Sequence, residues 1–197
     1  AALDCLVVID VAMSETAQLA HYVLPASSQF EKWEATFFNL EFPQNYFHLR
    51  APILPPLPGP LPEAEIHRRL TRALGAVMDE DLAALHQAAA LIPSAGRGPF
   101  AAEFFRLTAE KPQLLALAPV LLYETLGPTL PDGAKEAAAL WGAAQICAMS
   151  FPESVQRAGF QGFGPELGEQ LFQAMLSGRS GMVFSVDDYE VTWQRLD

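Results

Sequence analysis

The sequence predicts a mixed α/β fold in which a strand-helix-strand edge is joined to a predominantly helical subdomain. Two observations lead to this prediction: residues 3–25 alternate strand-like and helix-like segments, and residues 77–180 contain Ala- and Leu-rich segments separated by Pro and Gly. The chain has 197 residues, of which 51% are hydrophobic and 18% are charged. A chain of this length and composition can bury a substantial core.

The predicted edge begins with residues 3–10, LDCLVVID, an apolar run without polar alternation. Such a run is typical of a parallel strand that is buried on both faces. Ser14 is placed to cap a short helix, and Glu15 adds a negative charge at the positive end of that helix. Residues 22–24 predict a second strand, which ends at Pro25. This order is Rossmann-like, and in such sheets ligands bind at the carboxyl ends of the strands.

Residues 26–50 mix aromatic side chains with Glu and Asn and follow no regular period, which indicates an irregular packed loop. Six of the eleven residues at 52–62 are proline, so we expect an extended strap; the alternative is a ligand for proline-recognising domains. A helix is predicted over residues 62–74, with Gly75 at its end. Its predicted apolar face comprises Ile66, Leu70, Ala73 and Leu74.

Further helices are predicted after Gly75, because periodic apolar segments are separated by Pro or Gly at each join. They cover residues 79–91, 100–110, 114–126 with a break at Pro119, 132–149 and 165–176. Short strands are predicted over residues 183–185 and 191–193. We therefore expect an α/β part at residues 1–76, a helical subdomain at 77–180, and short strands at 181–197 that return to the α/β part.

The charge balance argues against two classes of partner. Twelve Lys and Arg residues stand against 23 Asp and Glu residues, a formal net charge of −11. Such a surface repels nucleic acid and anionic membrane lipids. The sequence has no apolar run long enough to span a bilayer and no secretion signal, which predicts a cytoplasmic protein.

Cysteine, histidine and glycine patterns exclude several common sites. Cys5 and Cys147 are too few for a disulfide scaffold and are not spaced as zinc or iron–sulfur ligands, so we interpret both as buried apolar side chains. The histidines show no metal-ligand spacing, and no nucleophile elbow, dinucleotide fingerprint or phosphate loop occurs. The four histidines are His21, His48, His67 and His86.

One group of residues does suggest binding chemistry. Asp10 ends the first predicted strand and Ser14 begins the helix, so a carboxylate and a hydroxyl face one crevice near free backbone amides. This arrangement can bind a purine edge or a phosphate. The alternative is a capped helix beside a solvated aspartate.

The same residues resemble a known family. The segment VIDVAMSETAQLAHYVLPASSQFEKWEATFFN, followed by the helix PEAEIHRRLTRALG, is similar to the molybdopterin oxidoreductases of the dimethyl sulfoxide reductase and formate dehydrogenase superfamily. Their catalytic subunits carry a strand, then D-x-F-x-T-E-T-A, x-x-A-D-x-V-L-P, E-K and E-G-T, and a later helix ending in L-G. The resemblance covers about residues 3–75, and order, spacing and strand-helix-strand context all agree.

The resemblance implies a molybdenum or tungsten ion held by molybdopterin guanine dinucleotide in the complete enzyme, together with a 4Fe-4S cluster. It implies that Asp10 and Ser14 lie against the dinucleotide and that Glu34 is the acid of the E-G-T turn. The sequence differs from the family pattern in three places: His21 replaces an Asp, Ala35 replaces a Gly, and the E-K to E-G-T span is one residue longer. It assigns no catalytic residue and no metal ligand to this chain.

We therefore expect a fragment of a larger multidomain enzyme, an internal domain that forms one wall of the dinucleotide site. This reading also rests on the first residue, Ala1, and on the strand that begins directly after it. Alone, the chain is expected to hold no metal, to be inactive and to self-associate. Its partners would be the remaining domains of the same polypeptide and a redox partner subunit. The alternative is a non-catalytic helical protein-interaction module, which predicts a closed surface, whereas the fragment predicts an exposed apolar face.

Overall fold

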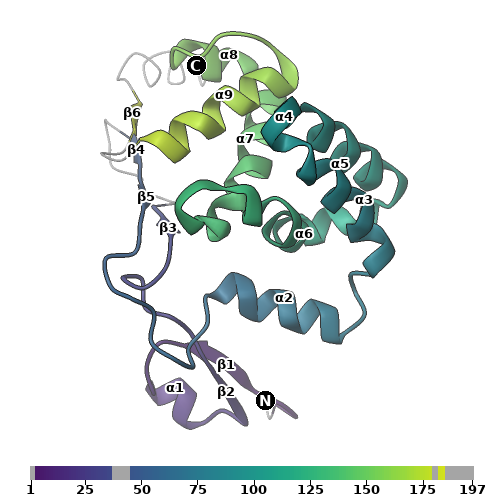
Figure 1. The fold of residues 1–197 in the computed structure, drawn as a ribbon. Helices are drawn as coiled ribbons and strands as arrows, with labels where there is room; N and C mark the ends of the chain where they lie inside the picture. The colour runs from purple at the N-terminus through teal and green to yellow at the C-terminus, as the bar shows by residue number, and fades with distance from the viewer. Residues whose placement is uncertain (1–2, 37–44, 179–181, 185–197) are drawn as a thin grey trace, which may run out of the picture.

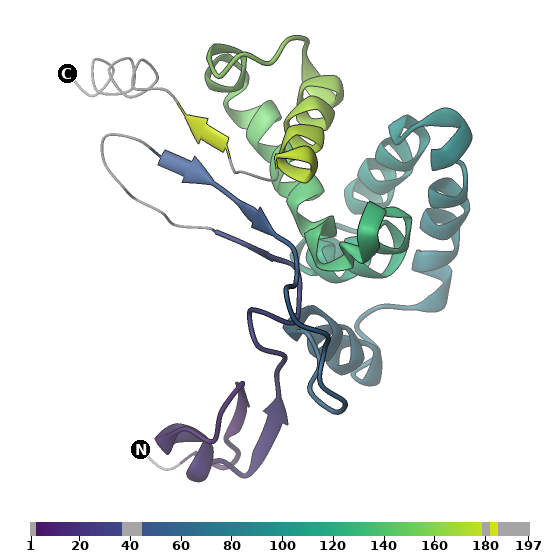
Figure 2. The same cartoon turned by 60° about the vertical axis from the view of Figure 1, so that its left-hand side comes forward.

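A computed structural model describes residues 3–36, 45–178 and 182–184 of the chain. The fold is mixed α/β and mostly helical, with few short strands. Figure 1 shows a small strand-helix-strand unit at one end and the helices gathered above it, with helix α2 between the two. Figure 2 shows from another side that this unit projects away from the helices.

The small unit consists of strand β1 (Val7–Asp10), helix α1 (Glu15–Gln18) and strand β2 (Tyr22–Pro25). The two strands are parallel and in register from Val7 opposite Tyr22 to Asp10 opposite Pro25. The predicted order of strand, capped helix and strand is therefore confirmed for these residues.

The predicted burial of the first strand is wrong. Val7 is 48% exposed, and none of the four β1 residues is buried. Among the described residues β1 pairs with β2 alone, in a two-stranded sheet. A strand is covered on both faces only when helices or further strands pack on both sides, and here nothing in the described chain does so.

The predicted loop at residues 26–50 contains short strands. Strand β3 (Glu34–Ala35) pairs antiparallel with β5 (Leu49–Arg50), and β4 (Asn45–Phe47) pairs antiparallel with β6 (Met182–Phe184). Segments of two or three residues are too short to show a period, so the sequence pattern did not reveal them. The strand predicted at residues 191–193 lies outside the described residues.

The proline-rich strap, residues 52–62, has no helix, and its one strand-like contact is the bridge between Ala26 and Leu61. Helix α2 (Glu63–Ala73) follows, and Gly75 takes the left-handed φ of 65° just after it, as predicted. The prediction of a packed apolar face is wrong for three of its four members. Ile66 is buried, but Ala73 is exposed, and Leu70 and Leu74 are 41% and 81% exposed.

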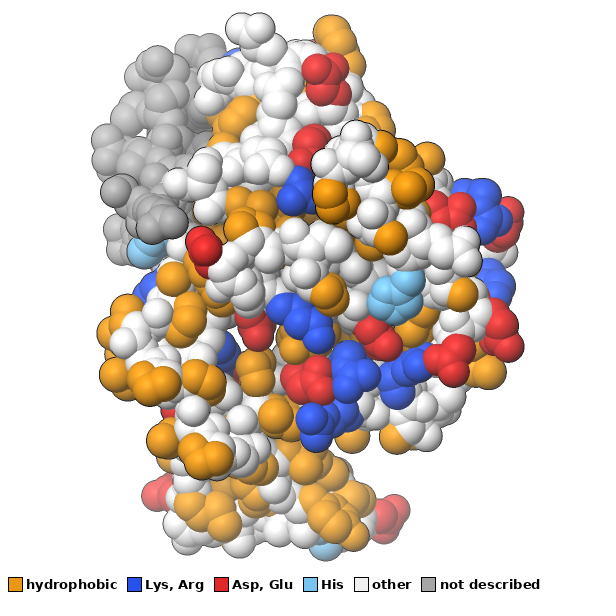
Figure 3. Space-filling model, viewed as in Figure 1, with side chains coloured by type: hydrophobic (Ala, Val, Ile, Leu, Met, Phe, Trp, Pro, Cys, Tyr) orange, Lys and Arg blue, Asp and Glu red, His pale blue; other side chains and the backbone are white. Residues whose placement is uncertain are grey.

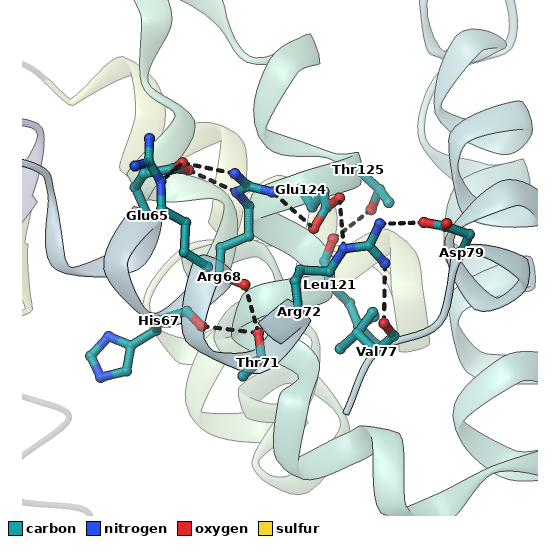
Figure 4. A network of polar contacts seen from close by, with 11 residues as sticks. Glu65, His67, Arg68, Thr71, Arg72, Val77, Asp79, Leu121, Glu124 and Thr125 are labelled. Atoms are coloured by element: carbon teal, nitrogen blue, oxygen red, sulfur yellow. Dashed lines mark hydrogen bonds and ion pairs between the residues drawn. The ribbon is translucent and has the colours of Figure 1, made fainter. Parts of the chain in front are cut away.

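The polar side of α2 makes the tertiary contact instead. Arg68 and Arg72 lie on either side of Glu124 in α6, 3.9 Å and 3.8 Å from its carboxylate oxygens (Figure 4). Arg72 also donates to the carbonyl of Val77 and pairs with Asp79 at the start of α3. This network joins three helices and orients α2 so that Leu70 and Leu74 face away from the helical core.

The helices after Gly75 follow the predicted segments closely. They are α3 (Asp79–Ala90), α5 (Gly98–Glu110), η1 (Pro112–Leu117), α6 (Ala118–Thr125), α7 (Ala138–Ser150) and α9 (Gly164–Ser177). Two short helices, α4 (Ile92–Ala95) and α8 (Pro152–Arg157), were not predicted.

The long helix predicted at residues 132–149 begins only at Ala138. Three 3₁₀ turns precede it, η2 (Gly127–Thr129), η3 (Pro131–Gly133) and η4 (Lys135–Ala137). Asp132 has a φ of 53°, a left-handed conformation that an α-helix cannot contain.

The hydrophobic core belongs to these helices. Trp141 of α7 is fully buried, and its ring meets Phe100 and Phe104 edge-on at 5.5 Å and 5.6 Å between centroids. Helices α7 and α9 pack so closely that a Cβ at Gly168 would lie 2.6 Å from Oε1 of Gln145. The buried core cluster includes no residue of β1, α1 or β2.

Candidate functional site at the carboxyl end of β1

Asp10 and Ser14 lie together, as the sequence predicted. The Oγ hydroxyl of Ser14 donates a hydrogen bond of 2.7 Å to Oδ2 of Asp10. Oδ1 of Asp10 accepts from the backbone N–H of Ala12 at 3.2 Å, and Oγ of Ser14 accepts from the N–H of Ala17 at 3.3 Å. The carboxylate is thus fixed at the end of the strand by the first turn of α1.

These hydrogen bonds define the charge of the site. They lower the pKa of Asp10, with the hydroxyl of Ser14 as the largest cause and the N–H of Ala12 as the next. Glu15 adds a second carboxylate at the start of α1. Because the hydroxyl hydrogen of Ser14 is already donated to Asp10, the site offers acceptors to a ligand, which favours a purine edge over a phosphate.

Glu34 is not brought to this carboxylate. It lies in β3, opposite Arg50 of β5, and its Oε2 is 3.3 Å from the guanidinium of that residue. Figures 1 and 2 both place β3 beside β5 and apart from the β1–α1–β2 unit. Spacing along the sequence could not reveal this pairing, because Glu34 and Arg50 lie in two separate strands and meet only when these strands pair.

His21 has a structural role that the sequence did not indicate. Its ring nitrogen Nδ1 accepts a hydrogen bond of 2.9 Å from the backbone N–H of Leu6. The backbone N–H of His21 donates to the carbonyl of Leu6, also at 2.9 Å. His21 therefore ties the start of β2 to the residue before β1.

The Glu31-Lys32 pair attaches the strap and helix α2. Glu31 accepts from the N–H of Ser28 at 2.8 Å and from the N–H of Leu57 at 2.9 Å, and these bonds lower its pKa. Lys32 forms an ion pair with Glu63 at the start of α2. Both side chains are therefore engaged in holding the chain after β2.

Other candidate chemistries receive little support from the described part of the chain. There, no group of three or more His, Cys, Asp or Glu residues is arranged to hold a metal ion. Cys147 is half-buried, which raises the pKa of its thiol, but Cys5 is exposed, so its predicted burial is wrong. The exposure of Cys5 has the same cause as that of Val7: no further layer covers β1.

Comparison of the chain with protein-family models, with curated proteins and with solved structures finds no match. No helix within the described ranges is both long and apolar enough to cross a membrane. The fold and the site thus define a mixed α/β, mostly helical protein with a hydrogen-bonded carboxylate at the end of a parallel strand.

Proposed function

We propose that this chain is an internal domain of a molybdopterin-dependent oxidoreductase, in which a Rossmann-like edge contributes one wall of the molybdopterin guanine dinucleotide site. The observation that carries the proposal is the carboxylate of Asp10, fixed at the carboxyl end of parallel strand β1 by Ser14. Ligands of open α/β sheets bind at this end of the strands. The resemblance of residues 3–75 to that family supplies the identity of the ligand.

The exposed apolar surface supports a role as one domain among several. Val7, Leu19 and Tyr22 are 48%, 78% and 65% exposed. Figure 3 shows hydrophobic side chains prevailing over the end of the molecule that holds β1, α1 and β2, whereas charges of both signs gather over α2 and α6. A self-contained interaction module would be expected to cover this end, so the alternative is less well supported.

The donor and acceptor chemistry of the site fits a guanine. The Watson–Crick edge of guanine presents N–H donors, and an ionised carboxylate is acceptor-only with about four lone-pair positions. Two of those of Asp10 are used by Ala12 and Ser14, which leaves others for a ligand. In this proposal Asp10 binds the dinucleotide and Ser14 positions the carboxylate.

Glu34 belongs to the proposal in a more limited way. Arg50 donates to its Oε2, and Oε1 has no partner of its own among the described hydrogen bonds. A contact of Glu34 with the dinucleotide would therefore use Oε1. When bound, the molybdenum or tungsten cofactor supplies the redox centre of such enzymes. In this proposal a 4Fe-4S cluster and a redox partner subunit belong to other parts of the assembly. The complete enzyme would act in the cytoplasm.

The test is the retention of the cofactor by the complete protein. Asp10→Asn keeps the shape of the side chain but removes the charge and one acceptor, so the affinity for the dinucleotide should fall roughly ten- to a hundredfold. Asp4→Asn is the matched control, because Asp4 is exposed and precedes the same strand. The readout is the amount of guanine nucleotide released from the purified protein by acid hydrolysis. Equal release from the Asp10→Asn and Asp4→Asn variants would refute the assignment.

A further inference from the structure

A hollow of about 310 Å³ lies between α2, the η1–α6 segment and the start of α7. Its walls are mainly aliphatic, and this combination of an apolar wall with a few polar groups is typical of sites for small organic ligands. At this volume the ligand would be small. The lining residues that matter below are His67, Thr71, Ala116, Tyr123, Glu136 and Ala139.

Glu136 is a carboxylate without a partner side chain in this hollow. It lies in η4, directly before α7, and is partly buried. Among the described residues no other side chain donates a hydrogen bond to it, and its carboxylate bonds only with its own backbone N–H. Burial raises its pKa above the ordinary value. A partly buried charge with no partner is costly, and a ligand cation would compensate it.

The remaining polar groups also present acceptors. Nδ1 of His67 lies 2.7 Å from the carbonyl oxygen of Glu63, and because a carbonyl can only accept, Nδ1 must carry the hydrogen. When the ring carries only this hydrogen, Nε2 is an acceptor. The hydroxyl of Thr71 donates within its own helix, to the carbonyls of His67 and Arg68 (Figure 4), which leaves its lone pairs free.

Tyr123 adds a neutral hydroxyl to the hollow. The residue is 5% exposed, and the nearby carboxylate of Glu65 is one cause that raises the pKa of its phenol. The hydroxyl oxygen of Tyr123 has lone pairs that can accept a hydrogen bond from a ligand. Burial is the largest cause, followed by the charges of Glu65 and Glu136, and all of them raise the pKa of Tyr123, so the phenol stays neutral.

We propose that this hollow binds a small organic cation, an ammonium or amidinium group on an apolar body, with the cationic group on Glu136. The polar groups of the hollow offer several acceptors and one negative charge, which a ligand with donor hydrogens and a positive charge complements. The aliphatic wall would hold the apolar body. The site is separate from Asp10, and the proposal does not depend on the dinucleotide.

No nearby lysine of the described residues already pairs with the carboxylate of Glu136. Lys32 and Lys135 both favour the charged form of Glu136, but neither forms an ion pair with it. Lys32 is paired with Glu63 in an adjoining hollow of about 320 Å³, which Glu136 also lines. The ammonium of Lys135 lies 4.1 Å from the centroid of the Tyr123 ring and does not line the hollow of Glu136 and His67.

The experiment is an NMR titration of the full chain at pH 8 with three probes of similar shape: phenethylamine, phenethyl alcohol and 3-phenylpropanoate. Phenethylamine should bind with a Kd on the order of 1 mM, as expected for a ligand of this size, and should shift the amide signals of Thr71, Tyr123 and Ala139. The neutral and anionic probes should bind at least tenfold more weakly.

Two variants and one control test the location. Glu136→Gln should weaken phenethylamine binding about tenfold, and Ala116→Phe should block the hollow from its exposed rim without touching the charge. Glu80→Gln, an exposed residue at the start of α3, should leave the Kd unchanged. The proposal is overturned if phenethylamine shifts no signals at 20 mM, if the alcohol binds as tightly, or if Glu136→Gln binds like the unaltered chain.

Discussion

Ser14 binds Asp10 and the helix end at once: its Oγ donates to Oδ2 of Asp10 at 2.7 Å and accepts from the N–H of Ala17 at 3.3 Å. The hydroxyl is therefore a cap for α1 and an orienting group for the strand-end carboxylate. Because the same atom makes both bonds, the charge of Asp10 and the start of the helix depend on each other.

Ser14→Ala should raise the pKa of Asp10 toward its ordinary value, because the largest cause of the lowered pKa is the hydrogen bond from Ser14. The charged form would then be lost at a higher pH than in the unaltered chain. An NMR titration of the Asp10 carboxyl carbon measures the shift. Ser14→Thr keeps the hydroxyl and should restore the low pKa; an unchanged midpoint in Ser14→Ala would contradict the role of this bond.

Glu65→Gln should lower the stability of the fold by about 1 kcal/mol at pH 7. Arg68 and Arg69 hydrogen-bond the Glu65 carboxylate and lower its pKa to about 2, with Arg68 as the largest cause. A lowered pKa stabilises the fold above the unfolded value, near 4.3, and that contribution disappears as the pH falls toward 2. Urea unfolding at pH 7 and pH 2.5 measures the difference between the two proteins, which should shrink at the lower pH. Glu110→Gln, on an exposed pair with Arg106, is the control and should have little effect at either pH.

Glu136→Gln should raise the stability of the fold at pH 7, in contrast to Glu65→Gln, which should lower it. Burial raises the pKa of Glu136, so the folded chain binds more protons than the unfolded chain above the ordinary pKa, and stability falls as the pH rises through that range. Removal of the charge should increase stability at pH 7 by less than about 1 kcal/mol, with no gain below pH 4. Thermal unfolding at both pH values checks this. A loss of stability at pH 7 would show that Glu136 has a stabilising partner.

Gly168→Ala should destabilise the helical core by about 1–3 kcal/mol. The new Cβ would lie 2.6 Å from Oε1 and 3.0 Å from Cα of Gln145, so α7 and α9 must move apart. Gly98→Ala is the control, since a Cβ there meets no atom within 4 Å. Urea denaturation of both variants measures the difference, and equal stability would contradict the close approach of the two helices.

The chain should self-associate through the face that holds β1, α1 and β2. Leu19 and Tyr22 are 78% and 65% exposed there, and β1 has an open edge among the described strands. Sedimentation velocity over a range of concentrations should show reversible oligomers, and Leu19→Glu with Tyr22→Glu should shift them to monomer. A chain that remains monomeric at every concentration would speak against this surface.

Local sequence determined those features that depend on neighbouring residues. The cap at Ser14, the parallel strands around α1, the end of α2 at Gly75 and the acidic start of α3 each follow from side chains within a few positions of one another. Hydrogen bonds at helix ends and backbone torsion angles act over this range, so spacing alone reveals them.

Only the tertiary structure decided which distant groups meet and which apolar faces are covered. Glu34 faces Arg50, Leu70 and Leu74 remain exposed because Arg68 and Arg72 face Glu124, and His67 shares a hollow with Glu136. None of these relations has a fixed spacing along the chain. Each results from the packing of whole helices, whose orientation is set by many side chains together, and periodicity within one segment does not contain that information.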